Sequence, residues 1–339
     1  MAITIRDVAR QLGLSTTTVS RALDGYDDVA EETRATVIQT AAEMGYAPNQ
    51  AARQLRRKRA DAIGYILPAE APRFSDPFFA EFIAGMGDQA ARHGYDLLVS
   101  TASPSSKTEQ ETYARWLHSR KVDGMVLNRM RLQDWRVQFL AQNGFPFVTF
   151  ERSRDPYEYP SVEVDEQHWF SVLVDHLVSC GHERIAYIGG PDDLKIEADR
   201  FAGFTQSMTA HELIIIPELV IHSDLTTEGG YKAATNLLHL DRPPTAIACI
   251  NDTTAIGVLH ASAEFGLAVG RDLAVAGFDG VEGFEHTLPP LTTINQPIYQ
   301  IACQLVQMLA DTLSGNPLSE QHVVIKPVLE IRQSTGGQT

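Results

Sequence analysis

The sequence contains little cysteine and no long apolar run. Its 339 residues include three cysteines, Cys180, Cys249 and Cys303, which are odd in number and far apart. This pattern argues against a secreted disulfide scaffold and fits a reducing cytosol. No stretch approaches the roughly 18 apolar residues that a membrane-spanning helix needs, and charged residues interrupt positions 1–15, where a signal peptide would need an apolar segment. We therefore expect a cytoplasmic protein that is neither exported nor inserted in a membrane.

Motifs that mark common enzyme and metal sites are also missing. The chain has no G-x-S-x-G nucleophile elbow, no Walker phosphate loop and no H-E-x-x-H zinc motif. A G-x-G-x-x-A match at 85–90 lies well inside an expected helix, whereas a dinucleotide fingerprint must open the helix directly after a strand. His176, Cys180 and His182 have weak metal-ligand spacing and no evident fourth ligand. We expect no enzyme activity, no metal site and no cofactor.

Positive charge is scarce and concentrated at the N-terminus. The chain has 28 Lys and Arg residues against 43 Asp and Glu residues, a formal net charge of −15. Residues 1–60 carry nine basic and seven acidic residues, a net charge of +2, so the remainder carries −17. Five of the basic residues fall within 53–59. A basic run is commonly only a solvated face, but charge asymmetry of this kind is also typical of a nucleic-acid-binding arm.

The first residues carry the pattern of two short helices. Apolar residues recur at helical spacing over 5–12, with Thr4 placed to cap this helix and Gly13 placed to end it. Ser15 can cap a second helix over 16–23. Two short helices joined by a three- or four-residue turn that contains glycine are the signature of a helix-turn-helix. The second helix of such a motif can lie in the major groove of DNA.

A third helix is expected over about 31–44, where it would close a small core. The alternative is an ordinary helical hairpin that packs on a larger domain, but the caps, the apolar stripe and the turn all favour the helix-turn-helix.

The second helix carries side chains that can contact bases. Its short hydroxyl side chains, which lie off its apolar face, can contact a thymine methyl or an acceptor, and Arg21 can bond bidentately to guanine. The residues off the apolar face of the second helix are Thr16, Thr17, Ser20 and Arg21, and those expected to close the three-helix core are Val29, Val37, Ile38, Ala41 and Met44.

The segment 50–59 combines a narrow apolar face with dense positive charge. Ala51, Ala52 and Leu55 share one helical face, and arginines surround it. Ten residues of this composition should be only marginally helical when free, and such a segment can become ordered when phosphates neutralise it. An exposed leucine flanked by arginines is also the composition of a side chain that wedges into the minor groove.

Four stretches together resemble the DNA-binding head of the lactose/galactose repressor (LacI/GalR) family: 4–23, 29–34, 45–49 and 51–56. The resemblance implies a homodimer with two heads on a pseudo-palindromic operator in double-stranded DNA. It implies base contacts from the start of the recognition helix, phosphate contacts beside them, and a hinge helix whose leucine enters the minor groove. The residues to which it assigns these roles are Ser15, Thr16, Thr17, Thr18, Arg21, Asn49, Leu55 and Arg56.

From residue 62 short apolar runs alternate with amphipathic helices. Repeated strand–helix units imply parallel sheets covered on both faces, and the number of strands exceeds one comfortable sheet. The expected fold is therefore a small all-α helix-turn-helix head plus an α/β body of two doubly wound parallel-sheet subdomains, and the resemblance implies the periplasmic-binding-protein type. Strands are expected over 62–67, 95–100, 122–127, 146–150, 161–164, 184–189, 218–223, 245–250, 273–278 and 291–294, with helices between them, for example over 78–92, 168–179, 196–211, 228–239 and 253–265.

The resemblance also implies how the chain divides. In this family the chain crosses between the two subdomains three times, here near 161–163, 291–293 and 321–323. The resulting domains are a DNA-binding head over 1–48, a hinge over 49–60, an N-subdomain over 61–162 and 293–321, and a C-subdomain over 163–292 and 322–339.

Ligands of open α/β sheets bind beyond the carboxyl ends of the strands. That rule selects residues that directly follow the expected strands or begin the next helix. A sugar site needs planar hydrogen-bonding groups around the hydroxyls and an aromatic face beneath the ring. The resemblance adds Arg200, whose guanidinium usually clamps two sugar hydroxyls. The expected effector-binding residues are Phe78, Phe79, Asn128, Glu151, Arg152, Asp165, Arg200, Asn251, Asp252, Phe278, Asp279 and Gln296.

Several of these residues have a structural alternative. Asp165 and Asp252 can instead cap helices, Phe278 can lie in the core, and Arg200 can form a subdomain ion pair. One loop position also departs from the family: Leu225 stands where several relatives hold an aromatic residue under the sugar. Trp169 likewise stands where a small residue is common, which can alter helix packing or the shape of the pocket.

The resemblance implies a ligand-responsive transcriptional regulator, most simply a repressor of sugar-utilisation genes controlled by a small carbohydrate. One alternative is a regulator that responds to a nucleobase or another non-sugar metabolite. Another is a cytosolic small-molecule-binding protein whose head docks a protein. The C-terminal residues 330–339 lack sustained heptads, so a dimer is expected rather than a coiled-coil tetramer.

Overall fold

A computed structural model describes residues 3–46, 59–68, 76–104 and 106–336. The chain forms two compact units, Met1–Asp61 and Ala62–Thr339. The first unit contains the head, and the second is the body. Three residues with expected DNA contacts, Asn49, Leu55 and Arg56, lie outside the described residues, as does most of the hinge proposed over 49–60.

The head is a three-helix unit made of α1 (Ile5–Leu12), α2 (Thr16–Leu23) and α3 (Glu31–Glu43). The Asp7 carboxylate accepts hydrogen bonds from the Thr4 backbone N–H at 3.0 Å and from the Thr4 hydroxyl at 2.7 Å, so both residues fix the start of α1. Gly13 ends α1 in the left-handed conformation, with φ of 66°. These features confirm the predicted helix-turn-helix.

The core of the head differs from the prediction at two positions. Ile38 is 51% exposed, because Val37 and Ala41 supply the buried face of α3 and Ile38 lies outside it. Ser20, expected off the apolar face of α2, is buried and donates a hydrogen bond to Asp24 at 3.3 Å. The fully or nearly buried apolar residues of the head are Val8, Ala9, Val19, Ala22, Val37 and Ala41.

The body contains two six-stranded sheets. The first has the order β11-β5-β4-β3-β1-β2, and every pair in it is parallel. The second has the order β12-β10-β9-β8-β6-β7 and is parallel except for β12 against β10. The strands of the first sheet are β1 (Ala62–Pro68), β2 (Asp96–Ala102), β3 (Gly124–Leu127), β4 (Phe147–Phe150), β5 (Ser161–Glu163) and β11 (His322–Val324). Those of the second are β6 (Ile185–Gly189), β7 (Val220–His222), β8 (Ala246–Cys249), β9 (Ala274–Asp279), β10 (Thr292–Asn295) and β12 (Val328–Glu330).

All ten predicted strands are present, and the two strands that were missed, β11 and β12, form sheet edges. Each is three residues long and partly exposed, so neither shows the buried apolar run on which the strand predictions depended. The antiparallel pairing of β12 was also not expected.

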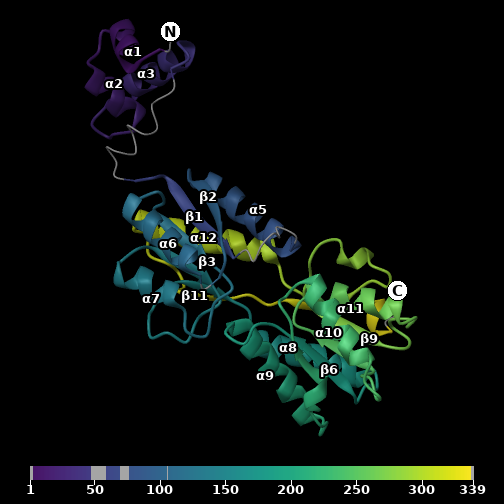
Figure 1. Cartoon of the computed structure of the whole chain (residues 1–339). Helices are drawn as coiled ribbons and strands as arrows, with labels where there is room; N and C mark the ends of the chain where they lie inside the picture. Colours follow the sequence, from purple (N-terminus) through teal and green to yellow (C-terminus); the bar gives the residue numbers. More distant parts are fainter. Residues whose placement is uncertain (1–2, 47–58, 69–75, 105, 337–339) are drawn as a thin grey trace. The chain divides into compact units, whose positions relative to one another are not determined.

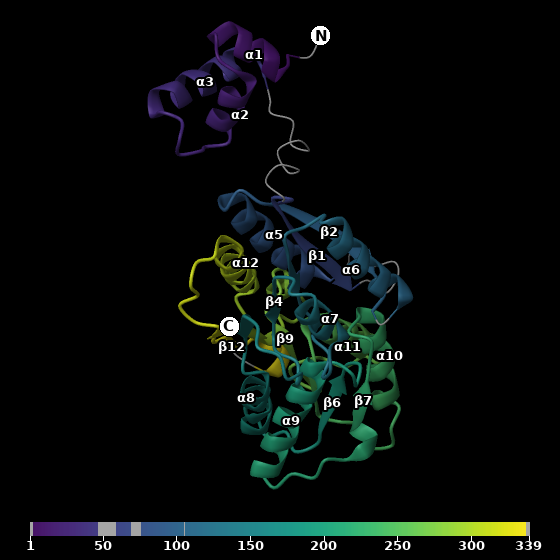
Figure 2. The same ribbon diagram turned by 90° about the vertical axis from the view of Figure 1, so that its left-hand side faces the viewer.

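Helices cover both sheets. The first sheet packs with α5 (Pro77–Arg92), α6 (Lys107–Ser119), α7 (Trp135–Gln142) and α12 (Ile298–Ser314); the second packs with α8 (Glu166–Ser179), α9 (Lys195–Ala210), α10 (Thr227–Leu238) and α11 (Asp252–Glu264). Figure 1 shows the yellow α12 among the blue elements of the first sheet, although it comes late in the chain. In Figure 2, α8 and α9 lie on one side of β6 and β7, and α10 and α11 lie on the other.

Strand pairing moves the predicted crossings a few residues later. β10 pairs with β9 and β12 and so lies wholly in the second sheet, whereas a crossing was expected near 291–293. β11 pairs with β5 in the first sheet, although 322–339 was assigned to the second subdomain. The chain therefore passes between the sheets after β5, after β10 and between β11 and β12, because each strand completes its ladder before the chain crosses.

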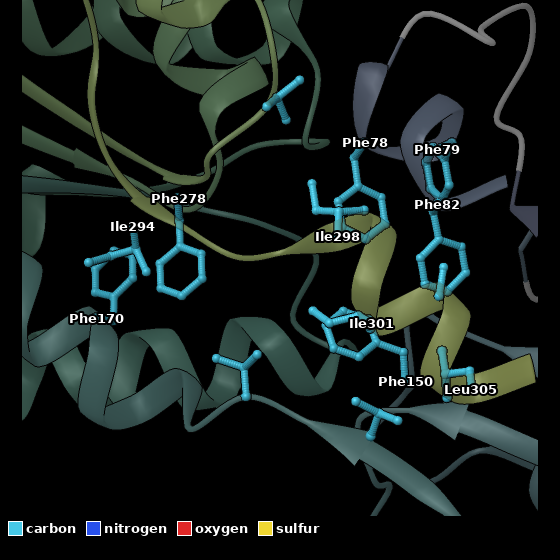
Figure 3. Packing of buried hydrophobic residues seen from close by; sticks show 14 of the residues in the cluster. Phe78, Phe79, Phe82, Phe150, Phe170, Phe278, Ile294, Ile298, Ile301 and Leu305 are labelled. Carbon is cyan, nitrogen blue, oxygen red and sulfur yellow. The ribbon is translucent and has the colours of Figure 1, made fainter. Parts of the chain in front are cut away.

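Aromatic and aliphatic side chains fill both halves of the body close to where the halves meet (Figure 3). In the first half the Phe78 and Phe82 rings stack with centroids 5.6 Å apart. In the second half the Phe170 and Phe278 rings stack with centroids 6.2 Å apart. These clusters hold the ends of α5 and β9 in place, and both elements contribute a residue to the wall of a cavity in the body, Phe78 from α5 and Asp279 from β9.

Candidate nucleic-acid interface and ligand cavity

The start of α2 presents short hydroxyl side chains to solvent. The Ser15 hydroxyl caps the helix by accepting a hydrogen bond from the Thr18 backbone N–H at 3.0 Å, and the Ser15 and Thr18 hydroxyls lie 2.9 Å apart. Thr16 and Thr17 are exposed at the first turn. The arrangement leaves Thr16 and Thr17 accessible to base edges, while Ser15 and Thr18 fix the end of the helix that would face a phosphate.

Arg21, at the far end of α2, is not free in this conformation. Its guanidinium forms an ion pair with the Asp28 carboxylate and lies over the Tyr26 ring, 5.1 Å from the ring centroid. The two charged side chains are 46% and 52% exposed, so both remain accessible to a partner. An Arg21 contact with guanine would require the side chain to leave Asp28.

Replacing Asp28 by asparagine should raise operator affinity. The substitution removes the counter-ion that Arg21 must abandon and one negative charge near the DNA, so we expect a gain of about threefold to tenfold. Gel-shift titrations at fixed salt would measure it. Asp27→Asn removes the same charge from an adjacent exposed residue and is the matched control. Equal gains in the two variants would mean that the Arg21–Asp28 pair does not oppose DNA binding.

A cavity of about 400 Å³ lies between the two sheets of the body. Most of its polar residues follow the carboxyl ends of parallel strands: Asn128 follows β3, Glu151 follows β4 and Asn251 follows β8. The lining residues are Phe78, Asn128, Arg129, Phe150, Glu151, Ile196, Arg200, Leu225, Asn251, Asp279 and Gln296.

Seven of the twelve expected effector-binding residues line this cavity, and five do not. Phe79 is buried beneath Arg129, whose guanidinium lies 4.9 Å from the ring centroid. Arg152 instead lies over the Tyr159 ring at 5.2 Å. Asp165 caps α8, its carboxylate accepting a hydrogen bond from the His168 backbone N–H at 3.0 Å. The seven that line the cavity are Phe78, Asn128, Glu151, Arg200, Asn251, Asp279 and Gln296.

Asp252 serves neither of the two roles considered for it. Asn251 caps α11 by accepting a hydrogen bond from the Thr254 backbone N–H at 2.9 Å. The buried Asp252 carboxylate instead accepts hydrogen bonds from the backbone N–H groups of Gly280 and Val281, at 2.8 and 3.0 Å, and from the Thr293 hydroxyl at 2.6 Å. It therefore holds the loop after β9, which positions Asp279.

Phe278 is the fifth expected residue that does not line the cavity. It is fully buried, in agreement with the alternative prediction that it lies in the core. Its ring lies 3.7 Å from the Arg200 guanidinium carbon and thus supports Arg200 from below. Among the lining residues not predicted, Arg129 directly follows Asn128, so the strand-end rule could have selected it. Ile196 lies one helical turn before Arg200 on α9 and is apolar, and nothing in its sequence context distinguishes it from a core residue.

Arg200 is the centre of a buried polar network and is only 2% exposed. Its Nε donates to Glu166 Oε2 at 2.7 Å, its Nη2 donates to Asp279 Oδ1 at 3.4 Å, and its Nη1 donates to the Ile250 carbonyl oxygen. Gln296 Nε2 also donates to Asp279 Oδ1, at 2.8 Å. The ion pairs predicted as an alternative role for Arg200 are present, and the same side chain lines the cavity.

Burial raises the pKa values of three carboxyl groups in or beside this network, those of Glu151, Asp252 and Asp279. The pKa of Asp279 is raised to about 8 by burial, against the opposing charge of Arg200. The pKa of Asp252 is raised to about 7 by burial, against its three hydrogen bonds. Burial and the charge of Glu166 hold the pKa of Glu151 well above its ordinary value. The cavity therefore carries less negative charge than its two carboxyl residues, Glu151 and Asp279, suggest.

These shifts predict that the protein loses stability as the pH rises. From about pH 4 up to about pH 7 for Asp252, and up to about pH 8 for Asp279, the group is ionised in the unfolded chain but mostly protonated in the folded one, so the free energy of unfolding falls as the pH rises. The loss is at most about 1.4 kcal/mol per pH unit for each group. Urea unfolding at pH 5, 6, 7 and 8 would measure it. The double variant D252N/D279N cannot ionise at these positions, so its free energy of unfolding should fall less between pH 5 and pH 8. An equal fall in the variant and the wild type would show that these two aspartates do not cause the pH dependence.

Two sets of contacts join the halves of the body beside the cavity. The Leu132 backbone N–H donates to the Asp193 carbonyl oxygen at 2.9 Å, and the Lys195 N–H donates to the Met130 carbonyl oxygen at 2.8 Å. Elsewhere, Thr253 on α11 donates to Asp76 Oδ1 at 3.4 Å. A ligand in the cavity thus lies between two halves that already contact each other, and any change in their relative angle must alter these contacts.

Among the described residues, no group of three or more His, Cys, Asp or Glu side chains is placed to hold a metal ion. His176 and Cys180 approach each other, with the ring Nε2 3.9 Å from the sulfur, but His176 also bonds to the Thr335 hydroxyl at 2.8 Å. Within the described part of the chain, no helix is both long and apolar enough to span a bilayer.

Comparison with known proteins gives a consistent result along the whole chain. The family model described as bacterial regulatory proteins of the lacI family matches residues 4–49, and the periplasmic binding protein-like domain matches residues 174–335. The chain is 34% identical to the HTH-type transcriptional regulator AglR of Rhizobium meliloti (strain 1021), covering 99% of this chain and 95% of AglR. It is also 34% identical to the HTH-type transcriptional repressor CytR of Escherichia coli (strain K12), covering 98% and 96%.

Solved structures agree with these sequence matches. The lac repressor dimer bound to operator and the anti-inducer ONPF is 27% identical, with a TM-score of 0.85, and the match covers 99% of both chains. The transcriptional regulator CelR in complex with cellobiose is 27% identical, with a TM-score of 0.75, and the match covers 98% of this chain and 99% of CelR.

Proposed function

Because the chain belongs to the LacI family of bacterial regulatory proteins, we propose that it represses sugar-utilisation genes and that a small carbohydrate in the body cavity controls its operator affinity. The relatives are DNA-binding transcriptional regulators.

The observation that carries the proposal is the cavity between the two sheets. Planar hydrogen-bonding groups from both halves face it, and Phe78 and Phe150 add aromatic walls. This is the combination that recognition of a hydroxyl-rich ring requires. The CelR structure, whose fold matches along nearly the whole chain, was determined with cellobiose, which supports a carbohydrate as the ligand class.

The head supplies the DNA-binding half of the proposal. Thr16, Thr17 and Arg21 are the proposed base contacts, and Ser15 and Thr18 the proposed phosphate contacts. The lac repressor structure is that of a dimer on its operator, which supports a homodimer on a pseudo-palindromic site for this chain. Because the chain outside residues 1–60 is strongly acidic, DNA affinity must come from the head and the hinge.

The proposed control works through the angle between the two halves of the body. A ligand that bridges them changes this angle and so the separation of the two hinges in the dimer, which alters the fit to the operator. The coupling must be reciprocal, because a ligand that weakens operator binding is itself bound more weakly by the operator complex, by the same factor.

A thermal-shift screen would test the ligand class. Purified protein is mixed with mono- and disaccharides, sugar phosphates and nucleobases. A ligand at 100 times its dissociation constant should add about 2.7 kcal/mol to the free energy of unfolding. A sugar that stabilises the protein and changes operator affinity supports the proposal. Stabilisation by a nucleobase alone would contradict the sugar assignment and favour the metabolite alternative.

The hinge provides a separate prediction. Leu55→Ala should lower operator affinity by about tenfold or more, because the smaller side chain cannot fill the unstacked minor-groove step. Ligand binding to the body should stay unchanged, since Leu55 lies outside it. Fluorescence anisotropy with labelled operator and thermal shift with ligand measure the two properties on one sample. Unchanged operator affinity would refute the wedge role.

A further inference from the structure

We propose, on the basis of the proposed function, that the cavity takes a sugar-sized ligand carrying a protonated amine, and that Glu151 is the residue that binds this amine. The inference comes from the charge and hydrogen-bond balance of the cavity. Three observations support it: the unsatisfied Glu151 carboxylate, the pairing of the neighbouring cations with other carboxylates, and the excess of unsatisfied acceptors in the cavity wall.

Glu151 is a buried carboxylate that faces the cavity. It directly follows β4, adopts a left-handed conformation with φ of 72°, and is 4% exposed. Its backbone is fixed, because the N–H donates to the Val162 carbonyl oxygen at 2.8 Å and the carbonyl accepts from the Thr149 hydroxyl at 2.6 Å. The Oε2 atom has no hydrogen-bond partner in the described part of the chain. A fixed backbone with an unsatisfied buried oxygen points to a partner that the ligand supplies.

The two cations whose charges lower the pKa of Glu151, Arg200 and Lys195, are already paired with other carboxylates. Arg200 bonds to Glu166 at 2.7 Å, with Asp279 at 3.4 Å, and its three guanidinium nitrogens all have acceptors. Lys195 pairs with Asp199 on the same helix. At the end of the neighbouring strand β3, Arg129 pairs with Asp76 at 2.9 Å.

No ion pair among the described residues includes Glu151, so its carboxylate lacks a dedicated counter-ion. Burial and the charge of Glu166 raise its pKa, which is the expected consequence of this lack. A bound ammonium group would supply the missing positive charge within the low-dielectric cavity.

The remaining unsatisfied atoms also favour a ligand that donates. Two buried acceptors of the cavity wall have no partner among the described residues, Glu151 Oε2 and Gln296 Oε1. Gln296 Nε2 is used internally, because it donates to Asp279. An ammonium group carries three donors and no acceptor, which matches this excess.

The competing interpretation is that Glu151 remains protonated and donates a hydrogen bond to an oxygen of a neutral sugar. Glu151→Gln separates the two, because glutamine keeps the shape and can donate but cannot pair with a cation. This variant should fold at least as well as the wild type, since it removes a buried group that is costly to ionise. Glu158→Gln is the matched control, because it removes the same charge from a side chain that is 79% exposed and outside the cavity.

Calorimetric titration of the full-length protein would test the proposal. The probes are glucosamine, galactosamine and mannosamine, their neutral parents glucose, galactose and mannose, and their N-acetyl derivatives, which keep the N–H but lose the charge. We expect at least one amine to bind tenfold or more tightly than both its parent and its N-acetyl form. This preference should disappear in Glu151→Gln and persist in Glu158→Gln.

Each other outcome overturns the proposal. A neutral sugar bound as tightly as its amine, an amine preference that survives Glu151→Gln, or no binding of any amine would each show that Glu151 does not select a cation. Tight binding of a neutral sugar would leave the proposed function intact while removing this inference. Operator binding, measured in the same samples, reports separately on the proposed function.

Discussion

Replacing Arg200 by alanine is expected to abolish the response of operator binding to ligand while leaving operator binding itself intact. The side chain lines the cavity and is bonded to Glu166 and Asp279, with Phe278 beneath it. Its loss removes the proposed sugar clamp, leaves the buried Glu166 carboxylate without its counter-ion and removes a hydrogen-bond donor from Asp279. Breaking a buried ion pair in this way costs about 3–5 kcal/mol. Urea unfolding and operator anisotropy with and without ligand would measure both effects.

A surface arginine provides the control for this substitution. Arg271 pairs with Asp272 at 2.8 Å, but the arginine side chain is 77% exposed, so Arg271→Ala should change neither stability nor ligand response appreciably. Arg200→Lys keeps the charge but loses the planar fork, so it should recover part of the stability and little of the response. A full ligand response in Arg200→Ala would show that Arg200 has a structural role only.

Gly257→Ala is expected to destabilise the body, although alanine favours helices. Gly257 lies where α11 packs against α10, and an added Cβ would come well under 3 Å from the Thr227 carbonyl oxygen and the Tyr231 backbone nitrogen. Backbone atoms cannot move aside as a flexible side chain can, so the helices would have to separate, at a cost of about 1–3 kcal/mol or more. Because Asn251 caps α11 at the cavity, ligand affinity should fall as well.

Gly87→Ala is the matched control. It makes the same chemical change within α5, where the nearest atom to the added Cβ would be a Leu97 methyl carbon at 3.9 Å. With ordinary contact and better helix propensity, this variant should gain about 0.5–1 kcal/mol. Thermal unfolding of both variants should therefore move in opposite directions. A Gly257→Ala protein as stable as Gly87→Ala would show that the α10–α11 contact is not rigid.

The elements of the fold could be predicted from the sequence because their signals are local. Caps such as Thr4 and Ser15 and apolar runs such as 245–250 identify helices and strands without reference to the rest of the chain. The strand-end rule also selected cavity residues such as Glu151 and Asn251, since the carboxyl ends of parallel strands share one edge.

Predictions that depended on tertiary packing were less successful. Val37 and Ile38 are neighbours on α3 and so point in different directions; Val37 faces the core and Ile38 faces solvent. An acidic residue at the start of a helix can turn towards the cavity, its own helix or a neighbouring loop. The Asp252 side chain turns towards the loop after β9. The edge strands β11 and β12 are too short and too exposed to show a pattern of their own. In each case the deciding contact comes from a segment far away in the sequence or on another element.

The most direct test of the account is operator binding as a function of ligand and salt. An operator selected from random duplex DNA is labelled, and its dissociation constant is measured by anisotropy for the full-length protein, with and without the ligand found by the screen. The account predicts salt-sensitive binding to a pseudo-palindromic site and an operator affinity that changes with ligand by the same factor as ligand affinity changes with operator. Absence of salt-sensitive duplex binding, or a cavity ligand that leaves operator affinity unchanged, would contradict it.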